Sequence, residues 1–226
     1  MKLFYRGKTK DVYNLGNGRL LMRFKDDGTV NEDGKFDPGG NEVGISIAGI
    51  GKANLRLTEH FFKVLKQNNI PTHFISANID DISMMVMAAN IFGQGIEVIC
   101  RFFAMGSFLR RYSSYINEYD ALDRLIEFTV KDDRRGDPPI TKETLNMLKI
   151  MENNQYDEIV SLTKKIGGII KHEFDKKGAT LLDIKFEFGI KDNSILLIDE
   201  ISTGGMRASK DGRLLNPFEI IDLILA

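Results

Sequence analysis

The chain is poor in several residue types that often mark a class of protein. Among its 226 residues it has one cysteine, no tryptophan, three histidines and five prolines. A single cysteine excludes an intramolecular disulfide and is usual in a reducing compartment. Cys100 lies inside an apolar run, so we expect a packed thiol rather than a metal ligand. The histidines are scattered without the spacing of a metal site, and we assign no chemistry to His60, His73 or His172.

Long apolar runs and a strong net charge are also missing. No stretch reaches the roughly 18 apolar residues that a membrane span needs, and the N-terminal residues lack the apolar core of a signal peptide. We therefore expect a cytoplasmic protein with no membrane partner. The formal net charge of −1 gives no overall attraction to nucleic acid, so any anion recognition must come from local basic clusters.

The pattern that is present indicates an α+β fold. Alternating residues on both sides of Asn17-Gly18 predict an N-terminal hairpin, and residues 26–51, rich in Gly, Asn and Asp, predict a long irregular loop. Helices are expected at 57–65, after Ser107 as an N-cap, at 141–151 and at 156–177, and further strands at 72–76, 84–89, 96–104, 180–190 and 194–202. Early strands, central helices and a late hairpin favour α+β over a doubly wound parallel sheet.

The late hairpin carries acidic residues in an unusual place. Asp183, Lys185 and Glu187 are spaced by two, so they project from one face of a strand. The next strand is continuously apolar and then ends in Asp199-Glu200. Antiparallel pairing about residues 192–193 would bring Glu187 and Asp199 together, as two carboxylates that share Mg²⁺ with phosphates. The alternative, a solvated and charged sheet face, is about equally supported by this segment alone.

The N-terminal segment YRGKTKDVY contains a glycine followed by two lysines. Gly7-Lys8-Thr9 is not a P-loop, because that motif needs a glycine five positions earlier and position 2 is a lysine. A glycine turn with Lys8 and Lys10 on one side could instead cover phosphates from above, as the glycine-rich loop of kinases does. Surface lysines on an edge strand are the alternative reading of this segment.

Two further segments could bind anions. In CRFFAMGSFLRRY, a strand would end at Ala104, Gly106 would permit a tight turn and Ser107 would begin a helix. A helix N-terminus attracts anions, and Arg101 would add positive charge, although an ordinary Ser cap is the commoner situation. The segment VKDDRRGDPP, which includes Lys131 and Asp137, reads as a charged and solvated turn.

Six motifs in order give the chain a resemblance to a known family. YRGKTKDVY, NIPTHFI, RFFAMGS, VKDD…DPP, DIKFEFG and IDEIS…R together resemble the SAICAR synthetases, over residues 3 to about 207. The resemblance implies a two-lobed α+β fold related to ATP-grasp proteins and kinases, with ATP in the cleft. We expect an N-terminal β-rich nucleotide-binding lobe at 1–95 and a mixed α/β lobe at 96–226.

The resemblance also implies a reaction. The family joins L-aspartate to the carboxylate of the ribonucleotide CAIR with ATP and Mg²⁺, through an acyl phosphate, to give SAICAR, ADP and phosphate in purine biosynthesis. Phosphorylation of the carboxylate supplies the leaving group that the amine needs. Two alternatives are a paralogous ligase or kinase with another ribonucleotide or carboxylate substrate, and a non-catalytic nucleotide-binding module. The paired carboxylates argue against the latter.

The resemblance assigns roles to residues at matching positions. Lys185, Arg207 and Asp183 match residues near the reacting carboxylate, and Glu187 and Asp199 match the carboxylates of the Mg²⁺–ATP site. The remaining matches are, for ATP, Gly7, Lys8 and Lys10, and for substrates, Arg101, Gly106, Ser107, Lys131 and Asp137.

The chain departs from the family pattern near the expected substrates. Phe102 replaces a usual Asn, Thr203 and Gly204 replace a Pro and an acidic residue, and Ala208 stands where an aromatic residue is usual. These positions bear on substrate identity more than on ATP binding. Residues 26–51 are a candidate lid on grounds of length and composition. The sequence does not decide whether the chain forms a homo-oligomer.

Overall fold

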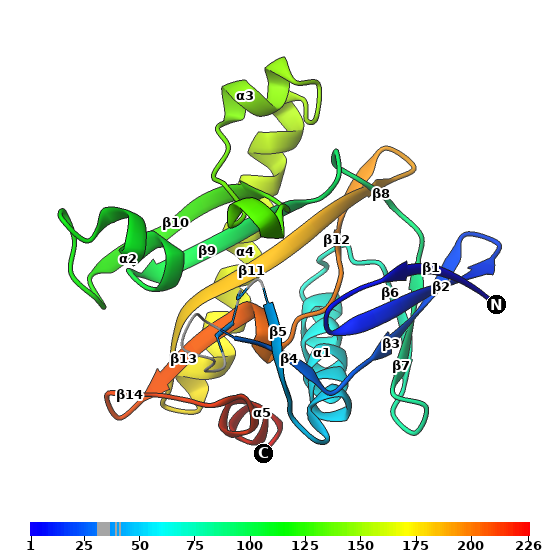
Figure 1. Cartoon of the computed structure of the whole chain (residues 1–226), viewed down its shortest axis with the longest axis horizontal. Coiled ribbons are helices and arrows are strands. Elements are labelled where there is room, and N and C mark those ends of the chain that lie inside the picture. Colours follow the sequence, from blue (N-terminus) through cyan, green and yellow to red (C-terminus); the bar gives the residue numbers. More distant parts are fainter. Residues whose placement is uncertain (31–36, 39, 41) are drawn as a thin grey trace.

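The computed structural model describes residues 1–30, 37–38, 40 and 42–226. It contains two large antiparallel sheets and one small one (Figure 1). The first sheet has the order β1(Lys2–Arg6), β2(Lys10–Gly16), β3(Arg19–Phe24), β7(Ser83–Met87), β6(Phe74–Asn78). Every strand pair within the sheets is antiparallel, which confirms the expected α+β class.

The second sheet is built around one long strand. β11(Thr180–Lys191) pairs with four neighbours along its length, because its two halves have different partners on each side. The strands around it are β8(Asn90–Ile91), β9(Ile96–Phe103), β10(Ala121–Val130), β12(Ser194–Ile198), β13(Met206–Lys210) and β14(Arg213–Leu214). The sequence patterns did not indicate β8, β10, β13 or β14.

Within the described residues, five helices cover and connect the sheets. They are α1(Ile50–Gln67), α2(Gly106–Tyr112), α3(Lys142–Met147), α4(Asn153–Lys176) and α5(Pro217–Leu225), with short 3₁₀ turns at Asp133–Arg135 and Thr203–Gly205. α4 packs against β9, β10 and β11 with a buried stripe that includes Ile159, Ile166 and Ile170, as the 3.6-residue period predicted. α1 contacts β3 and β6 of the first sheet and also the helices α4 and α5 (Figure 1). In the described part of the chain, no helix has both the length and the apolar character of a membrane span.

The N-terminal hairpin forms where the sequence predicted it. Gly16 pairs with Arg19, and Asn17 and Gly18 between them have φ angles of 51° and 68°. Both central residues of a type I′ turn must be left-handed, which is why Asn-Gly is favoured there.

Several predicted boundaries are wrong. Residues 26–51 are not an irregular loop throughout, since β4(Asp27–Val30) and β5(Glu42–Ser46) pair within them and α1 begins at Ile50. Residues 31–36, 39 and 41, the centre of the candidate lid, lie outside the described residues. The helix expected at 141–151 ends at Met147, and the late strand ends at Ile198.

Ser107 does not cap α2. The cap residue is Met105, it has an extended backbone, and the helix has no side-chain cap. Ser107 lies within the first turn, and its hydroxyl accepts a hydrogen bond from Arg101 at 3.0 Å. The Ser107 hydroxyl therefore orients an arginine instead of completing a helix end.

Candidate active site

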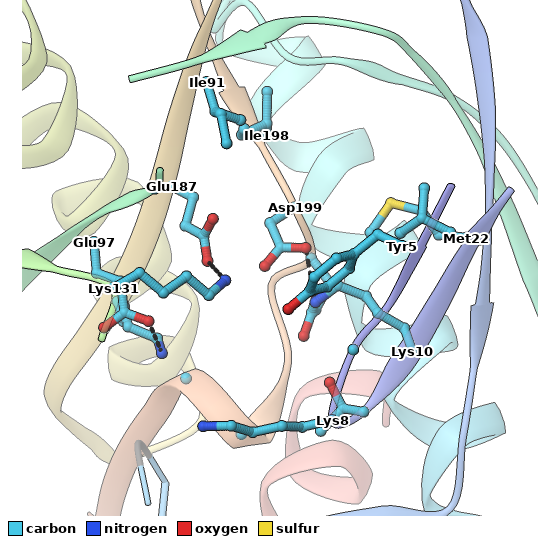
Figure 2. Close-up of a pocket in the computed structure, with 18 of the residues that line it drawn as sticks. Tyr5, Lys8, Lys10, Met22, Ile91, Glu97, Lys131, Glu187, Ile198 and Asp199 are labelled. Atoms are coloured by element: carbon cyan, nitrogen blue, oxygen red, sulfur yellow. Dashed lines mark hydrogen bonds and ion pairs between the residues drawn. The ribbon is translucent and has the colours of Figure 1, made fainter. Parts of the chain in front are cut away.

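A cavity of about 470 Å³ lies between the turn that joins β1 to β2 and the strands β11 and β12 (Figure 2). Its volume is in the usual range for a small-molecule site. Eight residues expected from the sequence line it: Gly7, Lys8, Lys10, Lys131, Asp137, Lys185, Glu187 and Asp199. Residues more than 190 positions apart in the chain thus surround one space.

The β11–β12 hairpin brings the two expected carboxylates together. Glu187 pairs directly with Ile198, so Asp199 follows at the end of the shorter strand. Asp199 has a left-handed backbone with φ 66°, a conformation that Asp adopts more readily than most residues. In Figure 2 both carboxylates point into the same space, Glu187 from one side and Asp199 from the other. The geometry predicted for this pair is present.

The turn between β1 and β2 depends on Gly7. Its N–H donates to the carbonyl of Lys10 at 2.9 Å, and a Cβ placed at Gly7 would lie 2.7 Å from that same oxygen. A larger residue would therefore open the turn. The Lys25 ammonium donates to the Gly7 carbonyl at 2.8 Å and so stabilises the turn. Lys8 and Lys10 consequently enter the cavity from one side.

Each lysine of the cavity has an acidic partner. Lys8 pairs with Asp133 at 2.6 Å, Lys131 with Glu187 at 2.6 Å and Lys185 with Glu97 at 2.7 Å. Lys10 pairs with Asp199 at 2.7 Å and also contacts Glu200. Positive and negative charges are thus interleaved along the walls of the cavity.

These pairs keep the lysines charged. Burial by itself lowers the pKa of Lys10, but Asp199 and Glu200 outweigh it and raise the pKa above its usual range. Burial likewise opposes the charge of Lys131 and Lys185, and their carboxylate partners raise both pKa values. The three ammonium groups are therefore protonated at physiological pH.

The pKa values of the acids in the cavity are shifted in opposite directions. Burial raises the pKa of Asp199, but Lys10 and Lys131 outweigh burial and hold that pKa far below its ordinary value. Burial and then the charge of Asp199 raise the pKa of Glu187, and the same two causes raise the pKa of Glu200 to about 7. Burial and the nearby Glu97 also raise the pKa of Asp137. Asp199 is therefore the most strongly ionised of these acids.

The donor set fits a divalent cation that is shared with phosphates. Among the residues that the structure describes, no group of three or more His, Cys, Asp or Glu side chains is placed to hold a metal. Two carboxylates that face one space, with phosphate oxygens and water completing the shell, are what Mg²⁺ commonly has in nucleotide sites. Glu187 and Asp199 meet that requirement. Within the described part of the chain they do not form a metal site made of protein ligands alone, which would need more donors.

The other expected residues form a second group beyond Lys185. Asp183 lies two residues before Lys185 on β11 and is only 2% exposed. It accepts from Arg101 at 3.1 Å and from Arg207 at 2.9 Å. Arg101 also donates to Glu127 at 2.7 Å and to Ser107. These residues do not line the main cavity, but Arg101, Ser107, Asp183 and Arg207 contact one another as a unit.

Gly106 belongs to this second group for a steric reason. Its φ is 55°, and a Cβ there would come within 2.9 Å of the Arg207 guanidinium. Arg207 also donates to Asp37 and to the Pro38 carbonyl at 2.7 and 2.6 Å. The arginine is thus held by β11 and by the segment after β4, and Gly106 of α2 leaves the space that its guanidinium occupies.

Sequence reasoning missed several residues of the cavity. Glu97 is 6% exposed on β9 and stands opposite Glu187, and the signal for it was the one acid in a strand that is apolar apart from Glu97 and Arg101. His73 is 5% exposed and its Nε2 lies 2.9 Å from the main-chain oxygen of Asp199. Burial lowers the pKa of His73 to about 4, so the imidazole is neutral. Asp133 could be recognised only from the fold, because its partner Lys8 is 125 residues away.

Most departures from the family pattern lie in the core. Phe102 and Ala208 are 6% and 0% exposed and belong to the hydrophobic core. Thr203 is 1% exposed, and its N–H and hydroxyl both donate to the side-chain oxygen of Asn54. Gly204 lines the main cavity. Of these four positions, Gly204 is therefore the one placed to affect what binds.

The chain is similar to proteins of one family along nearly its whole length. The SAICAR synthetase family model matches residues 3–213. A phosphoribosylaminoimidazole-succinocarboxamide synthase of Clostridium tetani is 53% identical over 227 residues, covering all of both chains, and that of Finegoldia magna is 36% identical over 89% of this chain and 83% of its own.

Solved structures agree with the sequence matches. A SAICAR synthetase in complex with ADP superposes with a TM-score of 0.84 at 28% identity, covering 97% of this chain and 93% of that one. The SAICAR synthetase of Pyrococcus horikoshii gives a TM-score of 0.81 at 28% identity, with 95% and 93% coverage. Matching motifs, full-length sequence similarity and a shared fold lead to one conclusion: this chain belongs to the SAICAR synthetase family.

Proposed function

We propose that the chain catalyses the ATP-dependent joining of L-aspartate to the carboxylate of CAIR, which gives SAICAR, ADP and phosphate. The observation that carries this proposal is the cavity in which the phosphate-covering turn, two facing carboxylates and Lys185 meet. Family membership and the 53% identity to a synthase over its full length support the same reaction.

The two ends of the cavity suit the two ends of ATP. One part of the lining is apolar and would accept the base: Val12, Leu20, Met22, Val86, Ile91 and Ile198. The other part carries Lys8, Lys10 and Lys131, and lysines are common point-charge ligands of phosphate. ATP would therefore lie with its triphosphate under the β1–β2 turn.

Glu187 and Asp199 would hold Mg²⁺ together with the phosphates. The bound cation would neutralise charge on the β- and γ-phosphates during transfer. Each carboxylate has a lysine partner, Lys131 for Glu187 and Lys10 for Asp199. With the carboxylates on the cation, Lys131 and Lys10 would each be free to bind a phosphate oxygen in place of a carboxylate.

The reaction would proceed in two transfers. A carboxylate oxygen of CAIR attacks the γ-phosphorus and ADP leaves, which gives an acyl phosphate. The aspartate amine then attacks the acyl carbon, loses a proton and expels phosphate, forming the amide. Lys185 lies on β11 between Asp183 of the second group and Glu187 of the cavity, and Glu97 holds its ammonium group. Its charge can stabilise the oxygens of the transferred phosphoryl group.

The second group would bind the substrates. Arg101, Ser107 and Arg207 supply donors for the ribonucleotide phosphate or for the carboxylates, and Asp183 fixes both guanidinium groups. Asp137 would contact substrate from the wall of the main cavity, and Lys131 would contact both the substrate and the triphosphate. We divide the chain into a β-rich nucleotide-binding lobe at 1–95 and a mixed α/β lobe at 96–226 that carries the substrate residues and the carboxylates of the Mg²⁺–ATP site. We place the reaction in the cytoplasm. A homo-oligomer is compatible with this proposal.

The proposal is tested by ADP release. Purified protein with Mg²⁺, ATP, CAIR and aspartate should release ADP and form SAICAR, and omission of aspartate should stop product formation. Asp199→Asn should abolish turnover, because the strongly ionised cavity acid is lost. Asp192→Asn is a matched control in the same hairpin: Asp192 is in the exposed turn and contacts Lys191. Full activity of Asp199→Asn would refute the metal assignment, and ADP release without aspartate would favour a different acceptor.

A further inference from the structure

His73 contacts the backbone of the residue on which the proposed metal site depends. Its ring nitrogen Nε2 lies 2.9 Å from the main-chain oxygen of Asp199. A carbonyl oxygen can only accept, so Nε2 must carry the proton and donate. The ring is buried at the rear of the cavity, of which it forms part of the lining.

Asp199 needs such a support because its backbone is left-handed. β12 ends at Ile198, and at Asp199 the φ angle changes to 66°. Unusual backbone conformations persist at functional sites when the surroundings fix them from more than one side. The Asp199 side chain is held by Lys10 at 2.7 Å, and its carbonyl is held by His73. Two contacts therefore determine where the carboxylate points.

His73 is itself held by both large sheets. Its N–H donates to the Leu197 carbonyl of β12 at 3.0 Å, and its own carbonyl accepts from the N–H of Met87 in β7 at 2.8 Å. Thr72 forms a parallel bridge with Leu197, and the His73 ring lies 5.9 Å from that of Phe62 in α1. The hydrogen bonds fix the backbone of His73 and Phe62 packs near its ring, so the imidazole is well placed to orient the Asp199 carbonyl.

We propose that His73 is a positioning residue, which donates a hydrogen bond to the Asp199 carbonyl and so aims the Asp199 carboxylate at the magnesium–nucleotide complex. This inference rests on the proposed function for the identity of the ligand. Metal-ligand carboxylates commonly depend on such outer contacts for their orientation. The alternative role for His73 is that of an ordinary core residue whose hydrogen bond adds only to stability.

The test compares three variants in nucleotide binding, without turnover. His73→Leu removes the donor, while His73→Gln places an amide N–H near the position of the imidazole Nε2. Thr58→Val is the matched control, because Thr58 is fully buried in α1 and donates to the Ile201 carbonyl at 3.0 Å, two residues beyond Asp199. Calorimetric titration with ADP, with and without Mg²⁺, below the melting temperature of every variant, measures the gain in affinity that Mg²⁺ gives.

His73→Leu should weaken ADP binding in the presence of Mg²⁺ by about tenfold or more, the usual effect of removing an outer contact of a metal ligand. Binding of ADP without Mg²⁺ should change little. His73→Gln should restore most of the magnesium-dependent gain, and Thr58→Val should lower the melting temperature while keeping that gain. The proposal is overturned if His73→Leu keeps the full gain, or if Thr58→Val loses as much of it.

This test is separate from the test of the reaction. If the parent protein binds magnesium–ADP and responds to His73→Leu as described but makes no SAICAR, the positioning role stands and the proposed reaction fails. If the parent makes SAICAR and His73→Leu binds magnesium–ADP normally, the reaction stands and the positioning role fails.

Discussion

Two neighbouring glycines of α4 allow one packing prediction to be worked out in detail. Gly167 is buried against β9, and a Cβ there would lie 2.8 Å from the sulfur of Cys100 and 3.4 Å from its Cβ. Gly168 is partly exposed, and a Cβ there would meet only a guanidinium nitrogen of Arg124, at 3.9 Å. Gly167→Ala should therefore destabilise the protein relative to Gly168→Ala.

The comparison isolates the packing cost. Replacing glycine by alanine inside a helix stabilises it by about 1 kcal/mol at either position. That gain cancels when the two variants are compared, and overpacking at Gly167 costs about 1–3 kcal/mol. We expect Gly168→Ala to be more stable than the parent by up to about 1 kcal/mol. Gly167→Ala should be less stable than Gly168→Ala by about 1–3 kcal/mol.

Urea unfolding followed by far-UV circular dichroism measures these differences. Cys100→Ala removes the sulfur that the new methyl group would meet, so the double variant with Gly167→Ala should regain about 1–2 kcal/mol over the sum of the single effects. Equal stability of the two alanine variants, within about 0.5 kcal/mol, would refute the packing argument. Additivity in the double variant would locate the cost somewhere other than at Cys100.

The remaining predictions concern a buried base, an exposed ion pair and the thiol. Burial lowers the pKa of His73 from 6.5 to about 4, so in this pH range the unfolded chain binds a proton that the folded chain does not. The free energy of unfolding should therefore fall by about 3 kcal/mol between pH 6.5 and pH 4. Urea titrations at several pH values should show that the free energy of unfolding of His73→Gln depends less on pH. Asp133→Asn should change the melting temperature little, because the Lys8–Asp133 pair is on the surface. It should lower the KM for ATP, because Lys8 is released to bind phosphate. A raised KM in steady-state kinetics would contradict this prediction. Burial raises the pKa of Cys100 to about 12 and hides its thiol, so a disulfide reagent should label it only as the protein unfolds; rapid labelling of folded protein would be inconsistent.

Local patterns predicted the parts of the fold that local physics decides. The Asn17-Gly18 hairpin, the buried stripe of α4 and the pairing of Glu187 near Asp199 all follow from periodicity or turn chemistry. β10, at the edge of its sheet, was missed because most of its residues are partly or fully exposed, which blurs the alternation that marks a strand. The helix at residues 142–147 was overextended for a related reason, since apolar residues continue beyond its end.

Residue types in the candidate site were predictable, but their partners were not. Lys8, Lys10, Glu187 and Asp199 were identified from segment chemistry and from the family resemblance, and all line one cavity. Glu97 and His73 were missed, because each is a single polar residue whose meaning depends on a distant strand. The Ser107 cap was wrong because a nearby arginine, which local rules do not consider, competes for its hydroxyl.

The pairing of every cavity lysine with an acid also determines how variants of the site must be interpreted. An isolated buried charge is costly, and removing one partner of a buried pair leaves such a charge behind. Lys10 and Asp199 are largely buried, so replacing either one should reduce stability as well as activity, whereas Lys8 and Asp133 are more exposed and should separate the two effects. Loss of activity in a Lys10 variant is therefore evidence for phosphate binding only if the folded protein is shown to persist. The same loss in a Lys8 variant bears directly on the phosphates.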